Sequence, residues 1–137
     1  MFRCYLEAAK SKISNDQIID IVKDLKKQYP QADFTHGDCG VLALLLSKKF
    51  GGSISLVITD DEPDRALHVL FFKDFNYYDH TGMVFSDDVI RNYEDNYSED
   101  SIQIVDGYSS ADKKYILQMT EPKLSKKQID ELLSDNT

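Results

Sequence analysis

Three side chains that could perform thiol chemistry occur in a fixed order along the chain. Cys39 directly precedes an apolar run at 41–46, His68 lies inside the apolar segment 67–72, and Asp79 follows two tyrosines. A nucleophilic cysteine, a histidine that moves its proton and an acid that orients the histidine are the parts of a thiol hydrolase. The set predicts acyl-transfer chemistry, although a buried cysteine alone can equally be a small core residue.

The residues around Cys39 predict that its thiol lies at the start of a buried helix. This helix is expected to run from Cys39 to about Phe50, where Gly51 and Gly52 stop it. The unpaired N–H groups of a helix N-terminus stabilise a thiolate and can also hold the oxyanion of an acyl-transfer intermediate. Cys39 is therefore the expected nucleophile.

Three neighbours of Cys39 are expected to support the site as part of its oxyanion hole or its frame. Asp38 is expected to cap the helix, with its carboxylate turned onto helix amides and away from the sulfur. Gly37 and Gly40 lack side chains, so a substrate backbone could approach the thiol from both sides.

The stretch from 66 to 79 predicts a β-hairpin that carries His68 and Asp79. A two-residue turn at 73–74 would set the two residues directly opposite each other, whereas a turn at 74–75 would set them diagonally. In both registers they share one face of the sheet and lie close to hydrogen-bonding range. A three-residue loop would separate them, so the predicted pair depends on the turn.

Two further histidines compete for the role of base. His36 lies in a predicted loop, where a histidine is usually just exposed, and His80 should point to the face opposite Asp79. A metal site is not expected, because the chain has no Cys-x-x-Cys or His-x-x-x-His spacing. No cofactor is expected either.

These motifs resemble the papain-like superfamily of cysteine hydrolases, in the compact form with the order Cys, His, Asp that transglutaminase-like domains share. The chain looks like the small versions found in phages and bacteria. The resemblance covers roughly residues 34–95 and depends on the segments 37–40, 67–70 and 77–82.

The resemblance implies that Cys39 is the nucleophile, His68 the general base and then acid, and Asp79 the orienting residue. One position departs from the family pattern. Papain-type peptidases place an oxyanion-hole glutamine shortly before the cysteine, but here Asp33 holds roughly that place and Gln31 lies further upstream. Backbone amides would then have to form the oxyanion hole.

The remaining patterns complete an α+β class, with a papain-like core of helices packed on a small antiparallel sheet, in one domain over 1–137. Loops are expected at 60–65 and 92–100. The other expected elements are helices from the Ser14/Gln17 capping box to Tyr29, from Ser86 through Tyr93, at 110–119 and from the Ser125/Gln128 box, and strands at 54–59, 66–72, 76–79 and 102–105.

Composition limits the partners. The 137-residue chain carries a net charge of −8, which argues against nucleic acid or an anionic membrane. It has no apolar stretch of bilayer length and no recognisable signal peptide, and two cysteines are too few for a disulfide framework. We therefore expect a cytoplasmic protein, in the host cytoplasm if phages encode it.

The sequence leaves two functions open. One is a thiol hydrolase or acyltransferase that acts on an amide of a protein or peptide, as a peptidase, deamidase or transglutaminase-type enzyme. The alternative is a non-enzymatic acidic interaction protein that uses the fold as a scaffold to bind a basic host protein, such as a phage-encoded inhibitor.

Overall fold

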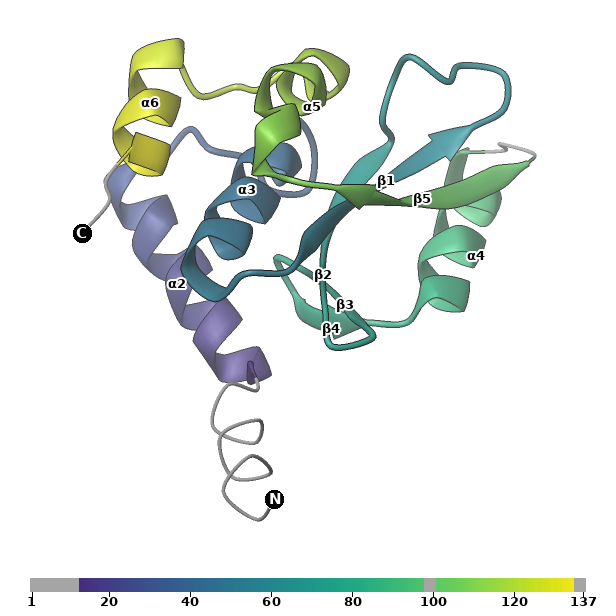
Figure 1. The fold of residues 1–137 in the computed structure, drawn as a ribbon, viewed down its shortest axis with the longest axis horizontal. Coiled ribbons are helices and arrows are strands. Elements are labelled where there is room, and N and C mark those ends of the chain that lie inside the picture. The colour runs from purple at the N-terminus through teal and green to yellow at the C-terminus, as the bar shows by residue number, and fades with distance from the viewer. Residues whose placement is uncertain (1–12, 98–100, 135–137) are drawn as a thin grey trace.

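An antiparallel sheet forms the centre of the molecule, with helices on both of its faces (Figure 1). The computed structural model describes residues 13–97 and 101–134. The strand order is β4-β3-β2-β1-β5. The strands are β1 (Ser53–Thr59), β2 (His68–Lys73), β3 (Asn76–Asp79), β4 (Gly82–Val84) and β5 (Ile102–Tyr108). The expected α+β class is confirmed.

The helices begin and end close to their predicted positions. Both Ser/Gln capping boxes form, with the serine hydroxyl accepting the glutamine N–H and the glutamine side chain accepting the serine N–H. The helices are α2 (Asn15–Gln28), α3 (Cys39–Phe50), α4 (Ser86–Tyr97), η1 (Ser110–Asp112), α5 (Lys113–Thr120) and α6 (Lys126–Ser134).

Three predictions need correction. The loop expected at 92–100 is wrong up to Tyr97, because α4 continues to that residue and buries Tyr93 against the sheet. Residues 98–100 lie outside the described residues. The helix expected at 110–119 is divided into η1 and α5, and β5 continues to Tyr108. Strand β4 was not predicted, since three residues are too few to show alternation.

The sheet separates two hydrophobic cores. Val69 and Phe71 of β2 point to the larger core, which α2, α3, α5 and α6 complete. Leu70 points to the smaller core, with Val89 and Tyr93 of α4. Helix α3 is buried on every side over Cys39 to Leu46, as its continuous apolar sequence requires. Within residues 13–97 and 101–134, no helix combines the length and apolarity needed to cross a membrane.

Candidate active site

Cys39 lies where the sequence predicts it, as the first residue of α3. Its side chain is a free thiol and the residue is 3% exposed. The first hydrogen bond of the helix joins Leu42 N–H to the Asp38 carbonyl. The N–H groups of Cys39, Gly40 and Val41 therefore have no helical carbonyl to bond, and they are available at the N-terminus for negative charge.

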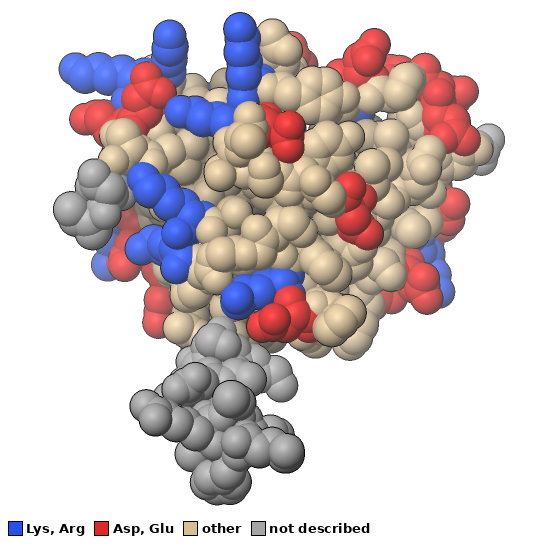
Figure 2. Space-filling model, in the orientation of Figure 1, with Lys and Arg blue, Asp and Glu red and all other residues tan. Residues whose placement is uncertain are grey.

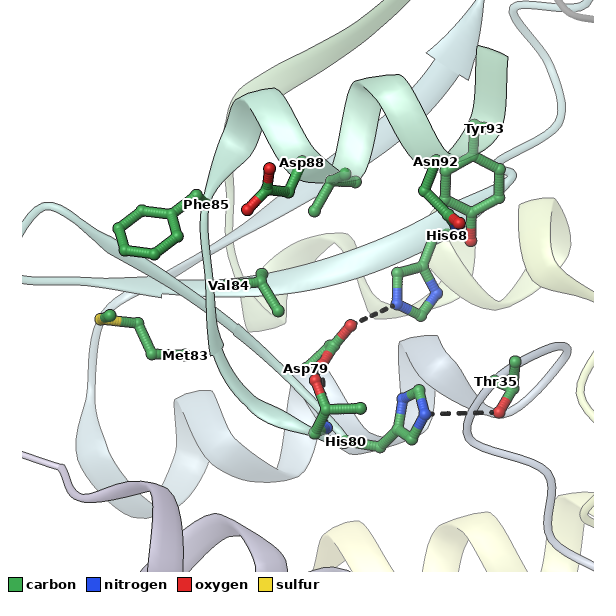
Figure 3. Close-up of a pocket in the computed structure, with 12 residues that line it drawn as sticks. Thr35, His68, Asp79, His80, Met83, Val84, Phe85, Asp88, Asn92 and Tyr93 are labelled. Atoms are coloured by element: carbon green, nitrogen blue, oxygen red, sulfur yellow. Dashed lines mark hydrogen bonds and ion pairs between the residues drawn. The ribbon is translucent and has the colours of Figure 1, made fainter. Parts of the chain in front are cut away.

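The hairpin brings His68 and Asp79 together through the second of the two predicted turns. The pairing of Phe71 with Tyr78 puts a two-residue turn at 74–75, where both residues have positive φ, 51° and 68°. This register sets Asp79 diagonal to His68 on the same face. His68 Nε2 and Asp79 Oδ2 are 3.2 Å apart (Figure 3).

The two side chains form an ion pair in which each stabilises the charge of the other. Burial lowers the pKa of His68, but hydrogen bonds to Asp79 and to Cys39 outweigh it and raise the pKa to about 9. Burial raises the pKa of Asp79, but hydrogen bonds from His68 and Thr81 lower it to about 2. At neutral pH the histidine is therefore cationic and the aspartate anionic.

One nitrogen of the His68 ring contacts Asp79, and the other is left for Cys39. Its Nε2 is occupied by Asp79. Its Nδ1 is buried and has no hydrogen-bond partner in the described part of the chain. Since Cys39 raises the pKa of His68 by hydrogen bonding and by charge, Nδ1 is the nitrogen available to the thiol. His68 is the first residue of β2, so its ring can reach the start of α3 at the end of the sheet.

Asp38 does not cap α3 as expected. It lies at the N-cap position with no side-chain bond to the helix. Its Oδ2 accepts the N–H of Asp33 at 2.9 Å, and its Oδ1 accepts the N–H groups of Lys123 and Leu124 at 2.9 and 3.1 Å. This fully buried carboxylate joins the loop before α3 to the loop after α5.

The two glycines do not open a path for substrate to the thiol, contrary to the sequence prediction. A Cβ on Gly40 would lie 3.0 Å from Ile116 Cγ2, so its missing side chain makes room for α5 and not for a substrate. Gly37 has φ +81°, and a Cβ there would lie 3.2 Å from the Glu121 carbonyl oxygen. Both glycines allow close packing around the start of α3.

Neither side chain considered for the oxyanion hole can serve in it. Gln31 donates to Gln128 on α6 at 2.7 Å. Lys123 Nζ, 3.0 Å from Asp33 Oδ2, lowers the pKa of that carboxyl, which also accepts the N–H groups of Thr35 and His36. An ionised carboxylate has no proton to donate to an oxyanion. The backbone amides at the start of α3 remain as donors.

His80 does not point away from the site, contrary to the sequence prediction. Asp79 is the last residue of β3, so strand alternation no longer governs the residue that follows. The His80 ring lies edge-on to His68, with centroids 6.2 Å apart, and its Nε2 is 3.4 Å from Thr35 Oγ1 (Figure 3). Burial lowers the pKa of His80. The sequence signal for this neighbour was its place directly after the acid.

Two cavities open beside these residues. The Cys39 pocket, about 220 Å³, is lined by Cys39, His36, Gly37, Arg65, Glu121 and Lys123, among others. The His80 pocket, about 370 Å³, is lined by His80, His68, Asp79, Asp88, Asn92 and Tyr93, among others (Figure 3). Cys39 lines only the first and His68 only the second, so the thiol and its histidine face different cavities.

Comparison of the chain with family models, with curated proteins and with solved structures finds no match. The chemistry of the site is therefore inferred from its own residues.

Proposed function

We propose that the protein is a thiol-dependent hydrolase or acyltransferase that acts on an amide bond, with a compact papain-like core. One observation carries this proposal. His68 is held by Asp79 through Nε2 at 3.2 Å, while its interaction with Cys39 raises its pKa. A thiol at a helix start, a buried histidine and an orienting acid supply the nucleophile, the base and its support.

The first half of the reaction breaks the amide. The reaction starts with His68 protonated and Cys39 as the thiolate, and the thiolate attacks the carbonyl carbon of the substrate. The N–H groups of Cys39 and Gly40 donate hydrogen bonds to the carbonyl oxygen as negative charge develops on it. The tetrahedral intermediate collapses as His68 donates its proton to the departing nitrogen, which leaves as ammonia or an amine. The acyl group stays on sulfur as a thioester.

The second half restores the thiolate. Water gives hydrolysis, and an amine gives acyl transfer; in each case His68 removes a proton from the attacking group. The thioester C–S bond breaks and the sulfur is released, while His68 keeps the proton taken from the attacking group, which restores the starting pair. Asp79 keeps the imidazole in one orientation throughout.

The size of the Cys39 pocket limits the substrate. Its volume of about 220 Å³ lies below the range of roughly 300–1,000 Å³ that is usual for small-molecule sites. The pocket suits a single side chain or a short stretch of peptide better than a whole small ligand. A protein or peptide amide therefore fits the site best.

Labelling with iodoacetamide at neutral pH tests the proposal. Cys39 should react faster in the native protein than in urea, where the helix start and His68 no longer support the thiolate. His68→Phe should slow labelling about tenfold or more, whereas Phe75→Ala, at an exposed turn, should leave the rate unchanged. Equal rates in native and urea-unfolded protein would remove the argument for an activated thiol.

A second function is supported by the distribution of charge. Figure 2 shows several acidic side chains on the side of the β1–β2 loop and α4, and most of the lysine and arginine side chains on the opposite side, around α5 and α6, with some acids among them. The loop contributes four exposed acids, Asp60, Asp61, Glu62 and Asp64. This side could bind a basic protein without catalysis. Cys39→Ala that keeps full biological activity would favour this function over the enzyme.

A further inference from the structure

We propose that His68, Asp79 and His80 form a binding site for one divalent transition-metal ion, with Zn²⁺ as the best match. Each residue offers one ligand atom, and these atoms all lie within 4.8 Å of one another. Imidazole nitrogens with one carboxylate oxygen suit Zn²⁺, and a set of three leaves a further position open. The site shares His68 and Asp79 with the proposed catalytic residues but does not use the thiol.

The distance between the first two ligands fits a bound ion. Two ligands of a tetrahedral zinc site, each about 2.0–2.1 Å from the metal, are about 3.3 Å apart. His68 Nε2 and Asp79 Oδ2 are 3.2 Å apart. An ion can therefore replace the proton that these two atoms share, with His68 giving up that proton.

His80 supplies the third ligand. Its Nδ1 is buried and has no hydrogen-bond partner in the described segments. A buried, unpaired ring nitrogen is costly unless something binds it. To bind the same ion as the other two ligands, His80 Nδ1 must move closer to them. A small rotation of the ring about its side-chain torsions, which costs little energy, achieves this.

Neighbouring groups already hold two of the ligands. His80 Nε2 lies 3.4 Å from Thr35 Oγ1, which leaves Nδ1 for the ion. Asp79 Oδ1 accepts the Thr81 N–H at 2.8 Å and the Thr81 hydroxyl at 2.6 Å, which leaves Oδ2 facing His68. Metal ligands in proteins are commonly oriented in this way by a second partner.

The His80 pocket provides the open position. Figure 3 shows the three side chains beside this cavity, with Asp88 and Asn92 of α4 across it. The described residues that line the pocket include no lysine or arginine, and the charge of His68 is lost when its Nε2 gives up its proton to bind the ion. Water or an added ligand can complete the coordination from this side.

Binding of Co²⁺ and Zn²⁺ to the full chain, after removal of metals with a chelator, tests the site. We expect one equivalent of Zn²⁺ by calorimetry and a Co²⁺ spectrum without the intense thiolate-to-metal band. His80→Ala and His80→Asn should each weaken binding at least tenfold. Cys39→Ser and His36→Ala should bind as the unaltered protein does.

Three results would overturn the proposal. The first is binding by the folded His80 variants, checked by circular dichroism, that equals the unaltered protein. The second is loss of the ion in Cys39→Ser together with a thiolate band in the unaltered protein, which would put the metal at Cys39. The third is an equal loss in His36→Ala, which would assign the ion to another histidine.

Discussion

The Cys39 pocket and the His80 pocket differ in the charged side chains that line them. The Cys39 pocket has Arg65 and Lys123 in its lining with one acid, Glu121, whereas the His80 pocket has Asp79 and Asp88 and neither lysine nor arginine. A carbonyl that becomes an oxyanion is better placed in the first, and a cation in the second. The two proposals therefore assign different nitrogens of the same buried imidazole, Nδ1 to the thiol and Nε2 to the ion.

The largest effect should come from the buried carboxylate of Asp38, which bonds the backbone of Lys123 beside the Cys39 pocket and is linked to the His80 pocket only indirectly, through Asp33 and Thr35. Asp38→Asn puts an NH₂ group against backbone N–H groups that now donate to oxygen. We expect a loss of about 3 kcal/mol in the free energy of unfolding, measured with urea. Labelling of Cys39 should also change, because Lys123 and His36 line its pocket.

The same variant should disturb the His80 pocket less than the Cys39 pocket in the protein that stays folded, because it is linked to His80 through Asp33 and Thr35 and not by direct contact. Zn²⁺ binding would then be retained at concentrations of urea where the protein is native. Asp16→Asn, at an exposed position in the first turn of α2, is the matched control. Its stability should change by less than about 0.5 kcal/mol. A similarly small effect for Asp38→Asn would contradict the role of its carboxylate in joining the loop before α3 to the loop after α5.

The next effect comes from Asp79→Asn, which should alter both pockets at once. The neutral amide no longer stabilises the imidazolium, so the pKa of His68 should fall from about 9. We expect Cys39 labelling at neutral pH to slow about tenfold and Zn²⁺ binding to weaken. NMR titration of His68, with iodoacetamide labelling of the same sample, measures the first two changes together. A lower melting temperature with both unchanged would mean that Asp79 only holds the turn through Thr81.

The smallest effect is a pH dependence of stability in chelator-treated protein. The raised pKa of His68 gives stability that is complete below pH 6.5 and lost as pH rises through about 9. The lowered pKa of Asp79 gives stability that is complete above pH 3.8 and lost as pH falls through about 2.

Between these limits the ion pair should stabilise the protein by about 1 kcal/mol, after the cost of burying both charges. The measurement is the difference in urea-unfolding free energy between the unaltered protein and Asp79→Asn at several pH values. A difference that stays constant from pH 4 to about 9 would show that the pair is not ionised in this way.

Local signals in the sequence predicted much of this arrangement. The capping residues Ser14 and Ser125 and the stop at Gly51 act through neighbouring backbone, so their effects can be derived residue by residue. The parity of His68 and Asp79 also follows from strand geometry once a two-residue turn is assumed.

The errors occur where distant segments determine the outcome. Asp38 bonds the amides of residues far along the chain, and Gly40 is matched to Ile116 of α5. Such contacts cannot be derived from the local sequence, since a small residue or an acid at a helix start gives the same pattern whether or not it makes a long-range contact. The placement of His80 depends on where β3 ends, and element ends are the least predictable feature of a sequence.

The turn that sets the register of His68 and Asp79 has a consequence for the order of folding. A type I′ turn favours Asn-Gly, yet here Asp74 and the 93% exposed Phe75 hold positive φ, which costs a side chain with a Cβ roughly 1 kcal/mol or more. Such a turn does not favour early formation of the hairpin during folding. The hairpin should close only after α3 and β1 have formed a surface to receive it, so the site assembles late and Phe75→Gly should speed that step.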